Sequence, residues 1–99
     1  MRFEWDENKN KSNIEKHDID FHDAALIFSA PMYVISDDRY DYGEERSVGF
    51  GLLDSRIVAV AFTEPEEDVV RIISIRRASA YEQKQYEHYF KQLFRQDFG

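Results

Sequence analysis

The chain alternates between short apolar runs and polar segments, and its most continuous apolar run lies near the centre. Residues 56–63 contain Ile-Val-Ala-Val-Ala-Phe without an intervening charge, as expected of a central strand. Residues 45–53 and 69–76 also carry the apolar and β-branched residues typical of strands. Only a short turn at 54–55 and an acidic turn at 64–68 separate these segments, so the pattern predicts an antiparallel meander.

The remaining positions predict the other elements. In chain order the full set is a strand at 2–5, helices at about 7–17 and 21–28, strands at 32–36, 45–53, 56–63 and 69–76, and a helix at about 80–95. Asp6 and Asp20 stand at favoured N-cap positions, and Ser79 with Glu82 forms a capping box. This order predicts an α+β fold in which two N-terminal helices and a C-terminal helix pack with an antiparallel sheet. A chain of 99 residues is expected to form one domain, 1–99.

Side-chain patterns indicate how the elements pack. The first helix has Ile14 as its one clear apolar anchor and is weakened by asparagines. The second helix places four residues on one apolar face: Phe21, Ala24, Ala25 and Phe28. The last helix places five on one side, which is expected to pack on the core: Tyr86, Tyr89, Phe90, Leu93 and Phe94. In the first strand of the meander, Gly49 and Gly51 indicate a bulge or a close approach of backbone. A polar, tyrosine-bearing loop is expected at 37–43.

The last strand, 69–76, carries arginines among its β-branched residues. Because residues two apart share a face of a strand, Arg71 is predicted on the face of Ile75 and Arg77, and Arg76 on the other face. Guanidinium groups on a largely buried strand suit the binding of a phosphate or a carboxylate. Ion pairs with acidic side chains of the chain itself are the alternative, which the residues alone favour.

Charge limits the range of functions. The chain has 20 acidic and 13 basic residues, a formal net charge of −7 and a sequence pI of about 4.9. This balance argues against nonspecific nucleic-acid binding, which depends on a basic surface. The acids cluster at 37–45 and 64–68, however, whereas the basic residues gather at 9–17 and 71–77. A local cationic patch on an acidic protein is therefore compatible with the sequence.

Several classes of site are excluded by composition. The chain has no cysteine, which rules out disulfides and thiolate metal sites. No apolar run approaches the length of a membrane span, so a soluble cytoplasmic protein without membrane contact is expected. No metal motif, glycine-rich phosphate loop or nucleophile elbow is present. The expectation is therefore a protein without metal or cofactor.

A few polar residues in structured contexts remain as candidates for chemistry: Lys16, His17, Glu45, Arg46, Arg71 and Arg76. Histidine is the natural general acid or base near neutral pH, and arginine stabilises charge on a phosphate. Such a set suits metal-free RNA cleavage, in which a base activates the ribose 2′-hydroxyl against the neighbouring phosphate. From the residues alone the structural alternative stays ahead, with His17 as a helix-end residue and Arg46 in an ion pair with Glu44 or Glu45.

Three stretches taken together resemble the BrnT family over roughly residues 3–87. They are Phe3-Glu4-Trp5-Asp6 with Lys9, Asn13, Lys16-His17, Ile19-Asp20-Phe21, Ala24-Ala25 and Phe28; Glu44-Glu45-Arg46 with Gly49; and Arg71-Ile72-Ile73-Ser74-Ile75-Arg76-Arg77-Ala78 with Glu82 and Tyr86. BrnT proteins are ribonuclease toxins of type II toxin–antitoxin modules in bacteria and archaea. The resemblance implies a RelE-like fold, a metal-independent endoribonuclease that inhibits translation, and neutralisation by a BrnA-like antitoxin.

The resemblance also implies roles for particular residues. His17 is the expected general acid or base. The expected contacts to the phosphate and the transition state are Lys16, Arg46 and Arg71. Arg76 is expected to be either a further catalytic contact or the structural partner of Glu82. Arg77 and Lys9 are expected to bind RNA. The position after His17, commonly Gly in the family, is Asp18 here, which tolerates the left-handed conformation less well.

The expected partners follow from the same resemblance. The antitoxin is expected to cover the cationic surface, and contact with operator DNA is expected only through the antitoxin. A dimer, or a heterotetramer with the antitoxin, is compatible with this picture. The acidic balance keeps an alternative open: a protein-binding module of the same fold with little or no nuclease activity.

Overall fold

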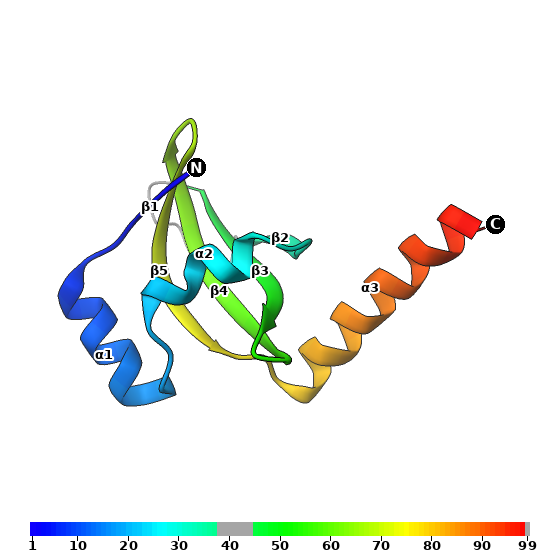
Figure 1. Cartoon of the computed structure of the whole chain (residues 1–99), viewed down its shortest axis with the longest axis horizontal. Coiled ribbons are helices and arrows are strands. Elements are labelled where there is room, and N and C mark those ends of the chain that lie inside the picture. The colour runs from blue at the N-terminus through cyan, green and yellow to red at the C-terminus, as the bar shows by residue number, and fades with distance from the viewer. Residues whose placement is uncertain (38–44, 99) are drawn as a thin grey trace.

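The computed structural model describes residues 1–37 and 45–98, with the backbone alone for residues 94–98. Within these residues the protein is an α+β structure with a five-stranded sheet in the order β1-β5-β4-β3-β2 (Figure 1). The elements are β1 (Arg2–Glu4), α1 (Glu7–His17), the 3₁₀ helix η1 (Phe21–Asp23), α2 (Ala24–Phe28), β2 (Tyr33–Asp37), β3 (Arg46–Leu53), β4 (Arg56–Glu66), β5 (Val69–Arg77) and α3 (Ala80–Phe98). No helix of the described residues is both long and apolar enough to cross a membrane.

The sheet is mixed rather than wholly antiparallel. Strands β3, β4 and β5 form the predicted antiparallel meander, and β2 pairs antiparallel with β3 at its edge. Strand β1 lies parallel to β5, with Arg2 opposite Val69 and Glu4 opposite Arg71. The prediction of an antiparallel sheet is therefore wrong for this edge. The short β1 pairs with only the first part of β5, because the chain leaves it at once to form α1.

Strand β5 contains an extra residue that reverses the alternation of its side chains. Ala61 pairs with Ser74 and the next residue of β4, Phe62, pairs with Ile72, so Ile73 has no position of its own in the ladder. Because of this bulge, the side chains before and after Ile73 do not follow one simple alternation between the two faces of the sheet.

The bulge decides which arginines share a face. Arg71 pairs with Thr63 and Arg76 pairs with Ala59, and these two β4 residues lie four positions apart on one face of the sheet. Arg71 and Arg76 are therefore on the same face, and Arg77 lies on the other. The prediction that placed Arg71 with Arg77 and away from Arg76 is wrong, because it assumed strict alternation through the whole strand.

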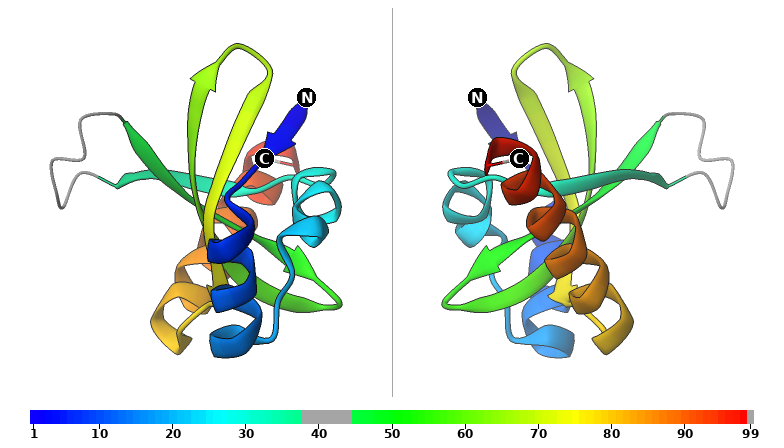
Figure 2. Two further views of the ribbon diagram at one scale, coloured as in Figure 1. Left: turned by 90° about the vertical axis from the view of Figure 1, so that its left-hand side faces the viewer. Right: turned by 90° about the vertical axis from the view of Figure 1, so that its right-hand side faces the viewer.

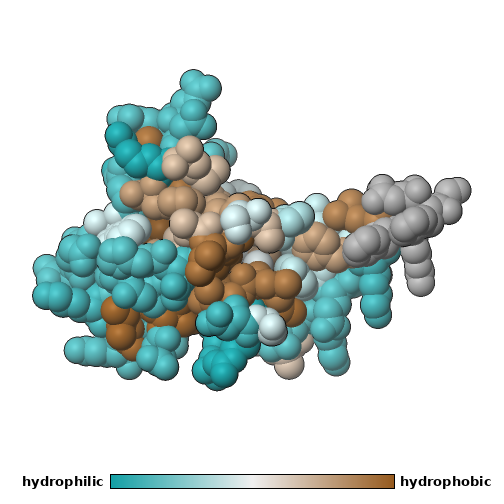
Figure 3. Space-filling model, viewed as in Figure 1, coloured by the Kyte–Doolittle hydropathy of each residue, from teal (hydrophilic) through white to brown (hydrophobic). Residues whose placement is uncertain are grey.

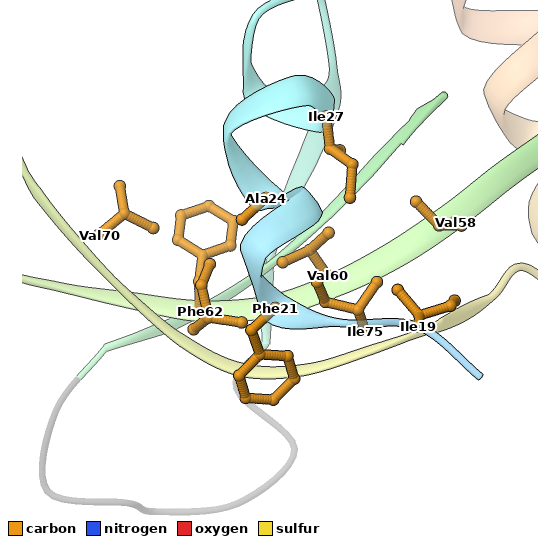
Figure 4. Close-up of a cluster of buried hydrophobic side chains, with 10 residues drawn as sticks. Ile19, Phe21, Ala24, Ile27, Val58, Val60, Phe62, Val70 and Ile75 are labelled. Atoms are coloured by element: carbon orange, nitrogen blue, oxygen red, sulfur yellow. The ribbon is translucent and has the colours of Figure 1, made fainter. Parts of the chain in front are cut away.

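Two apolar clusters lie on the two faces of the sheet. The larger cluster lies under α1, η1 and α2, and Figure 4 shows most of its side chains between α2 and the strands: Ile19, Phe21, Ala24, Ile27, Val58, Val60, Phe62, Val70, Ile72 and Ile75. The smaller one contains Phe50, Ala59 and Ala78, and Tyr86 of α3 packs against it. Figure 2 shows α2 and the first half of α3 on opposite sides of the sheet. In Figure 3, hydrophilic side chains cover α1 and apolar ones gather over α2 and the sheet beside it.

The helices bury other residues than those expected. In α1 the buried side chains are Asn10 and Asn13, whereas Ile14 is 38% exposed. In α2, Ile27 is fully buried and Ala25 is exposed. The predictions of Ile14 as the anchor and of Ala25 on the apolar face are therefore wrong.

Helix α3 begins as predicted at a capping box. Glu82 N–H donates to Ser79 Oγ at 3.2 Å, and Ser79 N–H donates to Glu82 Oε1 at 2.8 Å. The helix then runs away from the sheet (Figure 1), with Tyr89 stacked on Tyr33 of β2 at a ring-centroid distance of 4.6 Å. The side chain of Phe94, which was predicted to pack on the core, is outside the part that the structure describes. Of the loop predicted at 37–43, only Asp37 belongs to the described residues.

Candidate functional site

Five of the predicted site residues lie in two groups on opposite faces of the sheet. His17 and Arg77 are on the face that α1 covers, where they line one cavity with the core residues Ile19 and Val58. Arg46, Arg71 and Arg76 are on the opposite face. The sheet therefore separates the expected general acid or base from the expected phosphate contacts.

Buried asparagines fix α1 against the open edge of β5. Strand β1 pairs with β5 only as far as Arg71, so the outer edge of β5 beyond that residue needs other partners. Asn13 supplies them: its Nδ2 donates to Ile75 O at 2.9 Å, and Ile75 N–H donates to Asn13 Oδ1 at 3.1 Å. The same Nδ2 also donates to Ile19 O at 2.9 Å. A side-chain amide thus takes the place of a neighbouring strand.

A second asparagine joins α1 to η1. Phe21 N–H donates to Asn10 Oδ1 at 2.8 Å, and Asn10 Nδ2 donates to Asp20 Oδ1 at 3.0 Å. Asp20 caps η1 by accepting from His22 N–H, and these hydrogen bonds, above all those from His22, lower the pKa of Asp20 to about 2. Neither asparagine was predicted to be buried, although the polar residues at positions 10 and 13 were the signal of a buried polar face.

The Asn13 anchor brings His17 next to Arg77. His17 follows Asn13 by four residues and lies on the same side of α1, and Arg77 follows Ile75 by two residues on one face of β5. Both line a cavity of about 230 Å³, here called the His17 pocket. Its lining is His17, Asp18, Ile19, Asp23, Leu53, Asp54, Arg56, Val58 and Arg77. His17 is half-buried, whereas Arg56 and Arg77 are exposed.

The helix ends at this pocket as the sequence indicates. Asp18 adopts the left-handed conformation, with φ 58°, and its N–H donates to Ile14 O at 2.8 Å. An aspartate thus takes the conformation that glycine adopts most readily. Its carboxylate becomes part of the pocket lining.

The charges of the His17 pocket are of both signs. The guanidinium groups of Arg56 and Arg77 form no ion pair with a carboxylate of the described residues, although three aspartates also line the cavity. Within the same part of the chain, the imidazole of His17 makes no hydrogen bond. An imidazole that lines one cavity with two cationic residues can move a proton next to a phosphate bound there.

On the opposite face, five polar residues form a line across all the strands. We call it the polar row: Asp37 of β2, Arg46 of β3, Thr63 of β4, Arg71 of β5 and Glu4 of β1. Asp37 pairs with Arg46, Thr63 with Arg71, and Arg71 with Glu4. The pairing of Ser47 with Phe62 places Arg46 across from Thr63. Arg71 Nε donates to Glu4 Oε2 at 2.9 Å, and both side chains are more than a third exposed.

Arg76 lies on the same face and is held by α3. Its Nη1 donates to Glu82 Oε1 at 2.7 Å and its Nη2 to Glu82 Oε2 at 2.9 Å. This two-fold contact with Arg76 is the main cause that lowers the pKa of Glu82 to about 2. Of the two roles expected for Arg76, these hydrogen bonds agree with that of a structural partner of Glu82.

The other predicted residues lie apart from both groups. Lys9 and Lys16 are exposed in the first and last turns of α1, and neither lines the His17 pocket. Glu45 precedes Arg46 and lines a hollow with Ser47, Thr63 and Glu64. Among the described residues there is no group of three or more His, Cys, Asp or Glu side chains that could hold a metal ion.

Comparison with known proteins identifies the class. The family model described as "Ribonuclease toxin, BrnT, of type II toxin-antitoxin system" matches residues 5–82. The 1.1 Å crystal structure of the Brucella abortus ribonuclease toxin, BrnT, is similar, with a TM-score of 0.60 and 32% sequence identity over 80% of this chain and 97% of that chain. No curated protein matches. The fold and the matches define a ribonuclease toxin of a type II toxin–antitoxin system. The chain belongs to the BrnT family.

Proposed function

We propose that this chain is a metal-independent endoribonuclease whose catalytic centre is the His17 pocket. One observation carries the proposal: His17 shares a cavity with the guanidinium groups of Arg56 and Arg77, neither of which is in an ion pair with a described carboxylate. A base and two cationic groups around one space are what cleavage of an RNA phosphodiester needs.

The reaction follows from the chemistry of these groups. The His17 imidazole takes the proton of a ribose 2′-hydroxyl, and the 2′-oxygen attacks the adjacent phosphorus. The bond from phosphorus to the 5′-oxygen of the next nucleotide breaks, and that oxygen receives a proton from the imidazolium or from water. The products are a 2′,3′-cyclic phosphate and a 5′-hydroxyl end. Arg56 and Arg77 stabilise the charge that develops on the non-bridging oxygens.

RNA binding at this site depends on cationic residues near the pocket and not on the net charge of the protein. The net charge of −7 repels RNA at long range, and Asp18, Asp23 and Asp54 line the pocket itself. We propose that Lys9 and Lys16, exposed on α1, add contacts to neighbouring phosphates. Because the sheet separates them from His17, Arg46 and Arg71 are not assigned to the phosphate that the ribose 2′-oxygen attacks in the His17 pocket.

The biological setting is proposed from family membership. The partner is a BrnA-like antitoxin that neutralises the nuclease, and operator DNA is contacted only through that antitoxin. The fold is RelE-like, the consequence of cleavage is inhibition of translation, and the compartment is the cytoplasm. What supports each of these statements is the match to the toxin family over residues 5–82.

The test is cleavage of single-stranded RNA by the purified chain in EDTA, with His17→Asn and Arg77→Gln beside it. Loss of the general acid or base lowers kcat by about 10²–10⁴. Arg46→Ala/Arg71→Ala, on the other face, should retain most of the cleavage rate. If that double variant loses cleavage while His17→Asn retains it, the catalytic centre lies on the face of Arg46 and Arg71, and the proposal is wrong. Cleavage that stops in EDTA and returns with a divalent metal contradicts metal independence.

A second function, a binding module without nuclease activity, is favoured by the carboxylate pairs on the other face. Glu4 pairs with Arg71 and Glu82 pairs with Arg76, so both arginines already contact acidic side chains. Expression without antitoxin distinguishes the two functions. Growth arrest by the wild-type chain that His17→Asn abolishes supports the nuclease. Harmless expression of a folded chain that still binds its antitoxin supports the binding module.

A further inference from the structure

Strand β2 is an edge of the sheet, and among the described residues it pairs only with β3. Its outer backbone groups can therefore accept another strand. Natural edge strands are usually protected by lysine, proline or a bulge, but the sequence of β2 is Tyr-Val-Ile-Ser-Asp and its register with β3 is continuous. Val34 is 49% exposed and Ile35 is 39% exposed, one on each face of the sheet. Such an edge favours pairing with a further strand.

Helix α3 projects beyond this edge. The ring of Tyr89 stacks on Tyr33, the first residue of β2, and the helix then continues past the sheet (Figure 1). From Tyr89 to Phe98 the helix extends about 13 Å, which exceeds two strand spacings of about 4.8 Å. Leu93 lies one turn after Tyr89 on the same side of the helix and is 39% exposed. Helix α3 therefore places apolar surface over a space that no described strand fills.

A hollow lies beside α3 on the same face of the sheet. Its volume is about 230 Å³, and it is lined by Ile35, Ser36, Asp37, Val48, Phe50, Arg76 and Glu82. Three of these residues are apolar, and Phe50 belongs to the smaller apolar cluster against which Tyr86 packs. Each molecule thus has an open strand edge, a projecting apolar helix and, next to that edge, a hollow with apolar groups.

A second copy of this chain matches all three features at once. In an antiparallel pairing about a two-fold axis at Ile35, the five residues of β2 all pair, with Tyr33 opposite Asp37 of the other copy. Helix α3 leaves its own sheet at Tyr33, so its projecting half crosses the other copy at the Asp37 end of β2. The hollow lies at that end, and the two-fold axis gives the same contact in both directions.

The charges near this contact are balanced. Residues 80–93 of α3 contain two acids, Glu82 and Glu87, and two lysines, Lys84 and Lys91. The one charged residue of β2, Asp37, stands opposite the arginine that begins β3. The surfaces that meet are therefore close to neutral, whereas the whole chains, at −7 each, repel one another. Because salt screens that long-range repulsion, the association should strengthen as the salt concentration rises.

We propose that β2 and α3 form the interface of a symmetric homodimer. The two edge strands pair antiparallel, so that the two sheets join into one across the two-fold axis. Each α3 covers the edge strand of the other copy, and Leu93 packs at the hollow beside that strand. The interface involves neither the His17 pocket nor α1, and it goes beyond the cleavage reaction proposed above.

The test is sedimentation equilibrium of the purified full chain over a range of concentrations in low and in high salt. We expect a reversible equilibrium of monomer and dimer. Leu93→Lys should weaken the dimer about tenfold or more, because a charge replaces an apolar contact in both copies. Ile14→Lys is the matched control, since Ile14 is 38% exposed on α1, beside β5, and should leave the dimer unchanged. Circular dichroism verifies that both variants fold.

A single cysteine tests the register of the two strands, because the chain has no cysteine of its own. Residues directly opposite in an antiparallel pair have Cα atoms about 4.5–5.5 Å apart, a distance that a disulfide spans. Ile35→Cys should therefore give a disulfide-linked dimer in oxidised glutathione, whereas Ile14→Cys should not.

Each contrary result overturns the proposal. A wild-type chain that stays monomeric at every concentration excludes the homodimer and leaves the edge of β2 to a different protein. A dimer that Leu93→Lys leaves intact excludes the α3 contact, and a dimer that Ile35→Cys does not link excludes the pairing of the edge strands. These outcomes do not depend on whether the chain cleaves RNA, so failure of the dimer and failure of the proposed nuclease are distinguished.

Discussion

Asn13 and Ile75 exchange two hydrogen bonds, at 2.9 and 3.1 Å, between the side chain of a helix and the backbone of a strand. Both groups are buried. Strand β1 stops pairing with β5 at Arg71, so the backbone of Ile75 has no neighbouring strand on that side. The amide oxygen and nitrogen of Asn13 supply the acceptor and donor that such a strand would present. This contact sets the position of α1, and therefore of His17 relative to Arg77.

Replacement of Asn13 by alanine should destabilise the protein strongly. The change leaves Ile75 N–H and C=O buried without partners, at a cost of about 2–4 kcal/mol in the free energy of unfolding. Asn8→Ala is the matched control, because Asn8 is exposed on the same helix and should change that free energy by less than about 0.5 kcal/mol. Urea unfolding measures both. Equal midpoints for the two variants would show that water replaces the Asn13 amide.

The pairing of Glu82 with Arg76 should make the docking of α3 sensitive to acid. The pKa of Glu82 is lowered in the folded protein from 4.5 to about 2. A lowered folded pKa means that the carboxylate contributes stability that is complete above about pH 4.5 and is lost as the pH falls toward 2. Because Arg76 is 41% exposed, solvent screening keeps this contribution modest.

Glu82→Gln isolates that contribution. The variant should be less stable than the wild type at pH 7, and the two should converge in acid as Glu82 of the wild type is protonated. Far-ultraviolet circular dichroism in urea at several pH values measures the difference. The acid dependence that remains in Glu82→Gln should come largely from Asp20, whose pKa is also lowered to about 2. A constant difference between the two proteins from pH 7 to pH 2 would contradict the assignment.

The glycines of β3 should differ in their tolerance of alanine. A Cβ at Gly51 would lie 3.0 Å from Ile27 Cγ2, and Ile27 is fully buried and β-branched. A Cβ at Gly49 would lie 2.6 Å from Met32 Cε, the flexible end of a half-buried side chain. We expect Gly51→Ala to cost about 1–3 kcal/mol and Gly49→Ala to cost less. Thermal unfolding of the pair tests the order, and a reversed order would place the rigid contact at Phe62, 3.3 Å from the Cβ at Gly49.

These glycines also show which features of the fold can be predicted from the sequence. Their spacing indicated either a bulge or a close backbone approach, and the structure has the close approach in a β3 whose register is continuous. The local signals were reliable because each depends on near neighbours. Asp6 and Asp20 cap their helices, and Ser79 with Glu82 forms the capping box.

The features that could not be predicted from the sequence depend on contacts between distant segments. The extra residue at Ile73 is defined by its partners on β4, and periodicity along β5 alone does not reveal it. The burial of Asn13 depends on the open edge at Ile75, 62 residues away. For the same reason the sequence placed His17 and Arg71 in one site, whereas the sheet separates them. The grouping of His17 with Arg77 required the anchor between α1 and β5.

Asp18 offers a final test, because it belongs both to the helix end and to the His17 pocket. Its left-handed φ of 58° suits glycine better, so Asp18→Gly should stabilise the fold by about 0.5 kcal/mol. Both Asp18→Gly and Asp18→Asn remove a carboxylate from the pocket lining, so both should lower the KM for RNA about twofold to tenfold. Asp18→Asn tolerates the same backbone and should leave stability nearly unchanged. Steady-state cleavage with urea unfolding separates the two effects: a lower KM in both variants with a gain of stability in Gly alone is the expected result. An unchanged KM in both would mean that RNA does not approach the end of α1, and the catalytic centre would then have to be sought away from His17.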